Sequence, residues 1–345
     1  MKKFITLCFA SFATLIATAQ QPMATLDHND TIRVYYGDQA LKSAYNAAVP
    51  GDIITLSSGE FDGNNLYLEK NNLTIRGAGM RYDSITGTNA TTVTWSPRIR
   101  SGAHDCTIEG IFFNYHLYLE SSSNNRFNKC KFNDIYGSSS YALMYSFYSC
   151  IINKISINSG IIRNSNFYNC ILVTTSSTGN NSNCQVINYS GNALSNNWNN
   201  RIYNSVVQIG SNSSISSENA EYYNCILFSY YGNNTVNPVS QKCIGISVSG
   251  SFWGGNSQGL VNRTFANTFV NYTGGGYSDS QDFAITPEAQ AVLGMDSTQV
   301  GIYGGAHPFN PHVDEVPPII GRVTVPNHSN AEGRLDVNVE IINAQ

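Results

Sequence analysis

The chain has 345 residues, a formal net charge of −4 and only 12% charged side chains. A protein that neutralises nucleic-acid phosphates needs a basic patch, and the sequence shows none, which excludes nucleic acid as a partner. The length is ample for a large core. So little charge predicts a surface of Asn, Ser, Thr, Gly and Tyr, which suits neutral, hydroxyl-rich ligands such as glycans, or no ligand at all.

Residues 1–19 have the pattern of a secretory signal. Lys2 and Lys3 form a basic start, an apolar run covers residues 4–16, and Ala17-Thr18-Ala19 is an A-x-A cleavage site. The run is too short to span a membrane, and no later segment reaches the ~20 apolar residues that a span needs. We therefore expect an exported protein, located in the periplasm, at the cell surface or outside the cell.

Short strands are predicted directly after the signal. Residues 31–36 are typical of an opening strand, and residues 38–48 carry apolar side chains at helical spacing. Further strands are expected at 52–56, 66–68 and 73–76, separated by Gly and Asn. Strands this short and this frequent indicate an all-β fold with many bends.

From about residue 98 to 250 one phrase recurs: an apolar residue, two turn residues, a Cys or Ser, then an apolar pair. The Cys or Ser, here called position 0, recurs after 20 residues in the steps 130→150, 150→170 and 205→225, with looser copies at Cys106 and Cys243. A fixed period of this size predicts one unit per repeat, stacked into a solenoid. Positions −3, 0 and +2 should point inward, and position +1 outward.

Six of the seven cysteines after the signal, all but Cys184, lie near this one phase of the repeat. Since neighbouring rungs of a stack lie ~4.8 Å apart, the thiols should form an interior ladder. We expect them to be mostly reduced and buried, because stacked pairs would need backbone shifts to reach disulfide geometry. The chain has no CxxC pair, which argues against structural zinc.

Beyond residue 260 the repeat loosens, and residues 300–305 are expected to form the last coil. Pro308, Pro311, Pro317 and Pro318 mark a linker. The alternating apolar residues from Leu335 to Ile341 predict a strand that pairs with 319–325. The predicted organisation is therefore a signal at 1–19, one β-helix domain at 20–307, and a Pro-rich linker with a hairpin-like tail at 308–345.

Several phrases resemble the right-handed parallel β-helix proteins of the pectate-lyase-like superfamily. Residues 38–59, with Pro50-Gly51-Asp52 before a strand, resemble the helix-capped first coil of that family, and residues 72–79 resemble the strand that follows. Residues 282–287 and 300–305 are similar to the last coils of many secreted bacterial members. The resemblance covers roughly residues 30–306 and implies the fold. It implies no single activity, because the family includes lyases, hydrolases, esterases and adhesins.

Catalysis on such a fold would need a base for a lyase, or clustered carboxylates for a hydrolase. Asp134 and Lys154 share position +4 of consecutive copies and should form an ion pair, as should Arg201 and Glu221 at position −4. Arg163 has no evident column partner and is the one weak catalytic candidate. Glu109 and Glu120 are isolated in the repeat, and no pair of neighbouring carboxylates emerges.

Metal-binding signals are weak. His307, His312, Asp314 and Glu315 form the densest cluster of ligand-type residues, but a Pro-rich linker is a poor cage. Asp279 and Asp282 lie in a Gly-rich loop that calcium would suit. We predict no metal site and no cofactor, with calcium the only ion that the sequence suggests.

The aromatic residues give a stronger indication. Position −2 holds a column of tyrosines, which are the candidate ligand-binding residues: Tyr148, Tyr168, Tyr203 and Tyr223. Position +1 holds an outward apolar stripe: Ile151, Ile171, Val206 and Ile226. The stripe is either covered by the chain itself (by the 174–200 loop or by the tail from Pro308), or it is a partner or homo-oligomer interface. A third alternative is that the stripe and the tyrosine column together form a platform on which sugar rings stack.

Two functional hypotheses follow. The first is an exported scaffold without clear catalytic machinery that binds a polysaccharide or a cell-surface partner through its Tyr/Asn-rich face. The second is a polysaccharide lyase or glycoside hydrolase, which rests on the family resemblance and on export. The sequence leaves open whether the protein is an enzyme.

Overall fold

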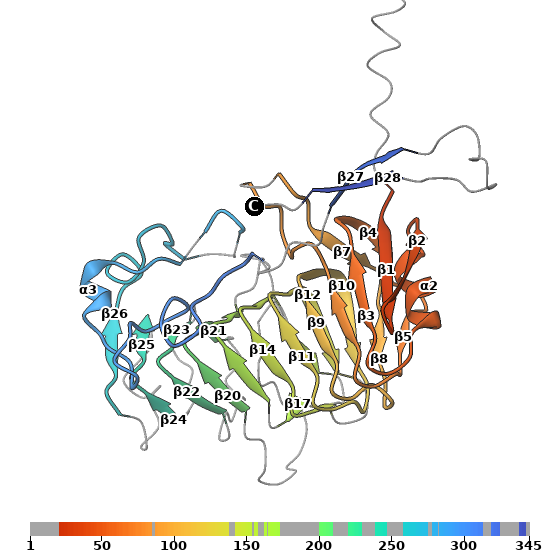
Figure 1. Ribbon diagram of the computed structural model, residues 1–345. Coiled ribbons are helices and arrows are strands. Elements are labelled where there is room, and N and C mark those ends of the chain that lie inside the picture. Colours follow the sequence, from red (N-terminus) through yellow and green to blue (C-terminus); the bar gives the residue numbers. More distant parts are fainter. Residues whose placement is uncertain are drawn as a thin grey trace, which may run out of the picture.

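The computed structural model describes residues 21–84, 87–137, 142–153, 155–157, 162–163, 165–172, 200–209, 220–229, 239–246, 258–274, 278–281, 283–312, 319–324 and 338–342. These residues form a parallel β-solenoid of about seven turns, with only two short helices (Figure 1). The predicted fold class is therefore confirmed. Some residues for which the sequence makes predictions lie outside the described ranges: the signal segment, Lys154, Cys184, Asp282, Asp314 and Glu315.

Each turn of the solenoid contributes strands to two long sheets. The first sheet, sheet A, has eleven strands, of which β1 and β2 form an antiparallel hairpin at one end. In spatial order its strands are β2 (Thr31–Tyr36), β1 (Met23–His28), β3 (Ile53–Leu56), β6 (Thr74–Arg76), β9 (Thr107–Glu109), β11 (Arg126–Asn128), β14 (Ser146–Tyr148), β18 (Asn166–Tyr168), β20 (Asn200–Tyr203), β22 (Ala220–Tyr223) and β24 (Val239–Gln241).

The second sheet, sheet B, has thirteen strands. Its main path is β26 (Val261–Arg263), β25 (Ile244–Ile246), β23 (Ile226–Ser229), β21 (Val206–Ile209), β19 (Ile171–Leu172), β15 (Ile151–Ile152), β12 (Lys131–Gly137), β10 (Ile111–Leu119), β7 (Thr91–Thr94) and β4 (Gly59–Asp62). Off this path, the later parts of β10 and β12 pair with β8 (Arg98–Ile99) and β16 (Ile155–Ile157), and β8 pairs with β5 (Tyr67–Leu68).

The remaining elements are small. Strands β13 (Ala142–Leu143) and β17 (Ile162–Arg163) form a parallel pair, and β27 (Ile319–Thr324) pairs antiparallel with β28 (Asn338–Ile342). The predicted pairing of the two tail strands is thus confirmed. The helices are α2 (Ala40–Ala47) and α3 (Pro287–Gln290).

The corner between sheet A and sheet B explains the recurring phrase. Position −1 is the only corner residue in the left-handed region, with φ between 45° and 56° in the six copies from Lys129 to Lys242. Asn fills three of these copies because its side chain tolerates that backbone. Position −2, which the sequence pattern assigned to the turn, is instead the last residue of the sheet A strand.

Position 0 is buried, and its side chain donates a hydrogen bond back to the carbonyl of position −2. Cys150 Sγ lies 3.3 Å from Tyr148 O, and Ser205 Oγ lies 2.7 Å from Tyr203 O. A small side chain with one donor satisfies this site, so Cys and Ser exchange there. Cys106 does not share the position: the register aligns Ile108 with Phe127, which places Ile111 at position 0. The looser copy predicted at Cys106 was therefore wrong.

The six described cysteines are free and buried. Burial raises the pKa of the Cys130, Cys150 and Cys225 thiols well above the usual value, because an apolar interior disfavours the thiolate. In a Cys8→Ser/Cys184→Ser variant, we expect the native thiols to resist a disulfide reagent at pH 8 and to react at the rate of unfolding. Fast modification of the native variant would contradict this arrangement; a urea-unfolded sample is the positive control.

The predicted outward direction of position +1 is confirmed, and the stripe is covered by the chain itself. Its four residues belong to a second apolar cluster that also contains Phe269, Phe283, Val300 and Ile302. The described covering residues lie mostly in 265–309, called here the cover segment, which reaches into the predicted tail at Phe309; residues 174–199 of the loop lie outside the described residues. Figure 1 shows this segment in blue beside β21, β23 and β25. The four stripe residues are at most 1% exposed.

The corner asparagines also hold the cover segment in place. Asn169 Nδ2 donates to the carbonyls of Ile302, at 2.8 Å, and Gly304, at 2.7 Å. Asn224 Oδ1 accepts from the backbone N–H of Met295 at 2.8 Å. A Cβ on Gly304 would lie 1.7 Å from the carbonyl oxygen of Gln299, so only glycine fits this approach.

The N-terminal end is closed by α2 and by two charged residues. Asp52, from the Pro-Gly-Asp phrase, is buried and accepts from the N–H of Val49 at 2.8 Å. Lys70 Nζ donates to the carbonyls of Tyr45 and Ala48, each at 2.7 Å, and so caps the last turn of α2. These contacts give both residues a structural role.

Candidate functional site

The predicted tyrosine column exists as a continuous ladder on the outer face of sheet A. Consecutive ring centroids of Tyr148, Tyr168, Tyr203 and Tyr223 lie 4.8, 5.1 and 5.0 Å apart, and the rings are within 13° of parallel. Parallel in-register pairing of β14, β18, β20 and β22 places one tyrosine on each rung. We call these four residues the tyrosine ladder.

The stacking decides what the ladder can offer a ligand. Both faces of Tyr168 and Tyr203 are taken by neighbouring rings, and the Arg126 guanidinium lies over Tyr148 at 4.2 Å from the ring centre. Sugar rings therefore cannot stack on the faces inside the ladder. The ring edges and hydroxyl groups remain, and partial burial raises the pKa of Tyr168 and Tyr203, so their hydroxyls stay protonated.

The predicted ion pair beside the ladder is present. Arg201 Nε lies 2.9 Å from Glu221 Oε2, which also accepts from the Tyr223 hydroxyl at 3.0 Å. The bond to Glu221 raises the pKa of Arg201. In the other predicted pair, Lys154 lies outside the described residues. Asp134 also lies near His116, with 3.2 Å between Oδ2 and Nδ1.

The weak catalytic candidate and the metal-type residues are not brought together among the described residues. Arg163 lies in β17 opposite Leu143, shortly before the ladder strand β18 in the chain, and its side chain is not described. His312 pairs with Asp83 at 3.4 Å, and Asp279 pairs with Lys131 at 2.7 Å. No group of three or more His, Cys, Asp or Glu side chains arranged for a metal occurs in the described part of the chain.

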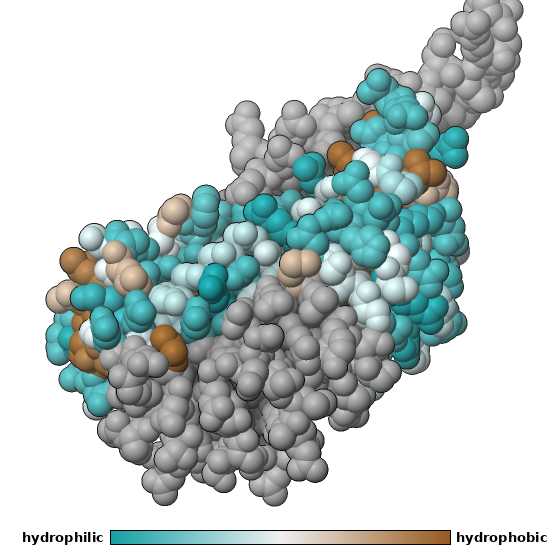
Figure 2. Space-filling view, turned by 90° about the horizontal axis from the view of Figure 1, so that it is seen from below, coloured by the Kyte–Doolittle hydropathy of each residue, from teal (hydrophilic) through white to brown (hydrophobic). Residues whose placement is uncertain are grey.

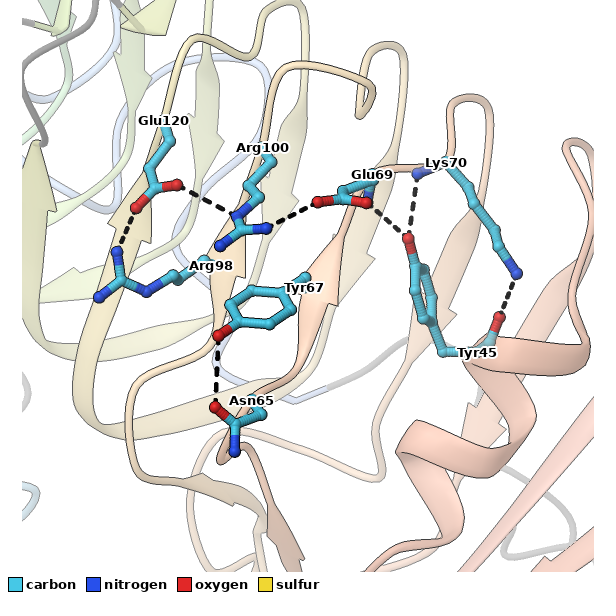
Figure 3. Close-up of polar contacts among 8 residues, drawn as sticks. All are labelled: Tyr45, Asn65, Tyr67, Glu69, Lys70, Arg98, Arg100 and Glu120. Atoms are coloured by element: carbon cyan, nitrogen blue, oxygen red, sulfur yellow. Dashed lines mark hydrogen bonds and ion pairs between the residues drawn. The ribbon is translucent and has the colours of Figure 1, made fainter.

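A second constellation, which the sequence pattern did not reveal, lies on the outer face of β5, β8, β10 and β12. Figure 3 shows its charged chain: Glu120 binds the guanidinium groups of both Arg98 and Arg100, and Arg100 continues to Glu69. The Arg100–Glu120 contact is 3.3 Å and the Arg100–Glu69 contact is 2.9 Å. Glu120, expected to be isolated, is thus the centre of a network, and Glu109 also has a neighbour, Arg76, at 3.9 Å.

Tyrosines run alongside these charges. The Arg98 guanidinium lies over Tyr118 at 4.3 Å, and the Arg100 guanidinium lies over Tyr67 at 3.7 Å. Tyr118 packs against Tyr136 with 4.9 Å between centroids. The strand register produces this order, because Tyr67, Arg98, Tyr118 and Tyr136 follow one another on adjacent strands.

His116 completes the constellation. It lies on β10 two residues before Tyr118, with its ring 4.3 Å from Tyr115 and 5.9 Å from Tyr136. Its Nδ1 lies 3.2 Å from Oδ2 of the buried Asp134 carboxylate. We call the set the Arg–Glu–Tyr array; its members are Tyr67, Glu69, Arg98, Arg100, His116, Tyr118, Glu120, Asp134 and Tyr136.

The array is accessible and nearly balanced in charge. Arg98, Arg100 and Glu69 have side chains that are 37%, 36% and 53% exposed, whereas Asp134 is 9% exposed. The hydrogen bond to Glu69 raises the pKa of Arg100. A guanidinium can only donate hydrogen bonds and a carboxylate can only accept them. Their alternation next to aromatic rings suits a ligand whose hydroxyl groups do both.

No helix in the described residues is long and apolar enough to cross a membrane. The coloured surface in Figure 2 is mostly hydrophilic, with small groups of apolar side chains near both ends of the solenoid. The exposed large apolar residues of the cover segment are Val270, Leu293 and Met295.

No protein-family model, curated protein or solved structure matches the chain.

Proposed function

We propose that this protein is an exported β-solenoid scaffold that binds a glycan, with the Arg–Glu–Tyr array as its binding face. The observation that carries the proposal is the array itself: two guanidinium groups and two carboxylates alternate beside a row of tyrosine rings. A sugar hydroxyl both donates and accepts hydrogen bonds, so each Arg–Glu pair can satisfy it completely. Since Arg98 and Arg100 are already neutralised by Glu69 and Glu120, the face favours neutral over acidic polysaccharides.

We also propose that the chain belongs to the pectate-lyase-like superfamily, on the evidence of its first coil. The Pro-Gly-Asp phrase closes the first coil through Asp52, and the solenoid follows directly. Together with the parallel rungs, this supports membership of the pectate-lyase-like superfamily, which stays a proposal.

One observation favours a second candidate function, a polysaccharide lyase or glycoside hydrolase. His116 lies 3.2 Å, from Nδ1 to Oδ2, from the buried carboxylate of Asp134 and beside Tyr118 and Tyr136. A histidine next to a carboxylate is suited to take up a proton, and a nearby tyrosine to give one. Ultraviolet absorbance of unsaturated products and the release of reducing ends, from neutral and uronic-acid polysaccharides, would report the activity. Turnover that is lost in His116→Ala would favour the enzyme over the scaffold.

The test of the scaffold is a binding panel of cellulose, xylan, mannan and polygalacturonate. We expect the wild-type protein to bind at least one neutral polymer more tightly than polygalacturonate. Arg100→Ala should weaken that binding by about 10- to 150-fold, because it removes a charged donor worth ~1.5–3 kcal/mol. Arg33→Ala, at an exposed position of β2, is the matched control and should leave affinity unchanged. Equal affinity of wild type and Arg100→Ala would refute the array as the binding face.

A further inference from the structure

The tyrosine ladder and the array lie on different sheets and on different turns. The array is carried by sheet B strands β5, β8, β10 and β12, whereas the ladder is carried by sheet A strands β14, β18, β20 and β22. The last array strand, β12, belongs to the turn before the first ladder strand, β14. The two surfaces are therefore separate faces of one rigid stack and not two parts of a single site.

The ladder offers the same hydrogen-bonding chemistry as the array. Among the described residues, the hydroxyls of Tyr148 and Tyr168 have no hydrogen-bond partner in the protein, while Tyr223 donates to Glu221. Arg201 and Glu221 add a donor and an acceptor to the row, at 50% and 29% exposure. The row repeats every 4.8–5.1 Å along the stack, so it presents equivalent groups to an extended chain.

The charge on the ladder also points to a neutral partner. Arg201 is paired with Glu221, and the Arg126 guanidinium is stacked on Tyr148 and bonded to Asn128 at 2.8 Å. Arg201 is thus compensated by Glu221, and the one charge left among the described residues of this row is that of Arg126 at its end. A polysaccharide without carboxylates, lying along the stack and bound through the hydroxyl row, fits this surface.

We propose that the tyrosine ladder is a second glycan-binding face, and that the protein cross-links neutral polysaccharide chains by holding one chain on each face. This inference rests on the proposed function of the array. Two sites on a rigid body that cannot both engage one short chain join two different chains instead. Cross-linking is a mechanical role in a polysaccharide matrix and needs no catalysis.

The experiment is a two-step capture assay with the full chain. Particles of cellulose, xylan and mannan are coated with protein and washed, then offered fluorescein-labelled soluble oligosaccharides of the same polymer. The ladder variant is Tyr168→Phe/Tyr203→Phe, which keeps the ring stack and removes two hydroxyls. The array variant is Arg100→Ala, and a third variant combines both. Unchanged thermal unfolding midpoints establish that each variant is folded.

We expect the wild type to capture labelled oligosaccharide on the particles to which it binds. Each single-face variant should still bind particles but capture at least tenfold less label, and the combined variant should lose both. Capture by the ladder variant equal to wild type would overturn the second face, and so would loss of all particle binding in the array variant alone; both leave the array intact as a site. Absence of wild-type binding to every particle would overturn the proposed function itself.

Discussion

Asn169→Ala should lower the free energy of unfolding by about 3–5 kcal/mol. The side chain is 4% exposed and donates to two carbonyls of the cover segment, Ile302 O and Gly304 O. Each buried carbonyl left without a donor costs ~1–3 kcal/mol. Asn169 also has φ 52°, a conformation that costs alanine ~1 kcal/mol or more. Urea unfolding of wild type and variant measures the difference.

Asn169→Gly separates the two contributions, because glycine accepts the left-handed backbone and lacks the amide. We expect the free energy of unfolding of Asn169→Gly to be about 1 kcal/mol higher than that of Asn169→Ala, and no more. Asn72→Gly is the matched control: Asn72 has the same φ, 52°, but is exposed. Its unfolding free energy should match that of wild type. If Asn169→Gly were as stable as wild type, the amide contacts would not hold the cover segment.

Phe147→Ala should cost about 3–5 kcal/mol, the range for deleting a fully buried aromatic ring. Phe147 is the middle of an interior stack, with centroids 5.2 Å from Phe127 and 4.7 Å from Phe167. A cavity at this level would remove packing from the rung above and the rung below at once. The midpoint of thermal unfolding, monitored by circular dichroism, measures the loss.

Phe147→Leu keeps most of the volume and should cost about half as much. Tyr82→Ala, at a side chain that is 58% exposed, is the surface control and should change the midpoint little. A Phe147→Ala protein with a wild-type midpoint would show that the ring stack contributes nothing to stability.

The repeat could be predicted from the sequence because each of its positions has one structural requirement. Positions −3, 0 and +2 fill the interior, position −1 needs the left-handed backbone, and position 0 needs one small donor, so few residue types suit each. The prediction for Cys106 was wrong because this buried cysteine lies before its sheet A strand, β9, whereas position 0 lies after the strand. Its backbone N–H donates to Asn125 Oδ1. At that turn position −1 is Gly110 and position 0 is Ile111, so neither residue type fits the recurring pattern.

The two candidate surfaces differ in how much the sequence could show. The ladder could be predicted, since its tyrosines keep one phase of the repeat, although their mutual stacking could not. The array could not be predicted. Its column members Tyr67, Arg98, Tyr118 and Tyr136 are 31, 20 and 18 residues apart, because the chain makes an excursion before β7 that breaks the period. The register of these strands is set by their pairing, and no residue type recurs at a fixed spacing in the sequence to indicate it.

The way in which the cover segment is held has a kinetic consequence. Asn169 meets Ile302 and Gly304 across 133 and 135 residues of chain, and Lys131 meets Asp279 across 148. Contacts between residues so far apart in the sequence form late in folding, because closing the long loop between them costs conformational entropy before the contact adds any stability. Until then the apolar stripe is open to water and to other chains. The chain therefore passes through a stage in which its rungs are stacked but the apolar stripe is still exposed, and docking of the cover segment ends that stage.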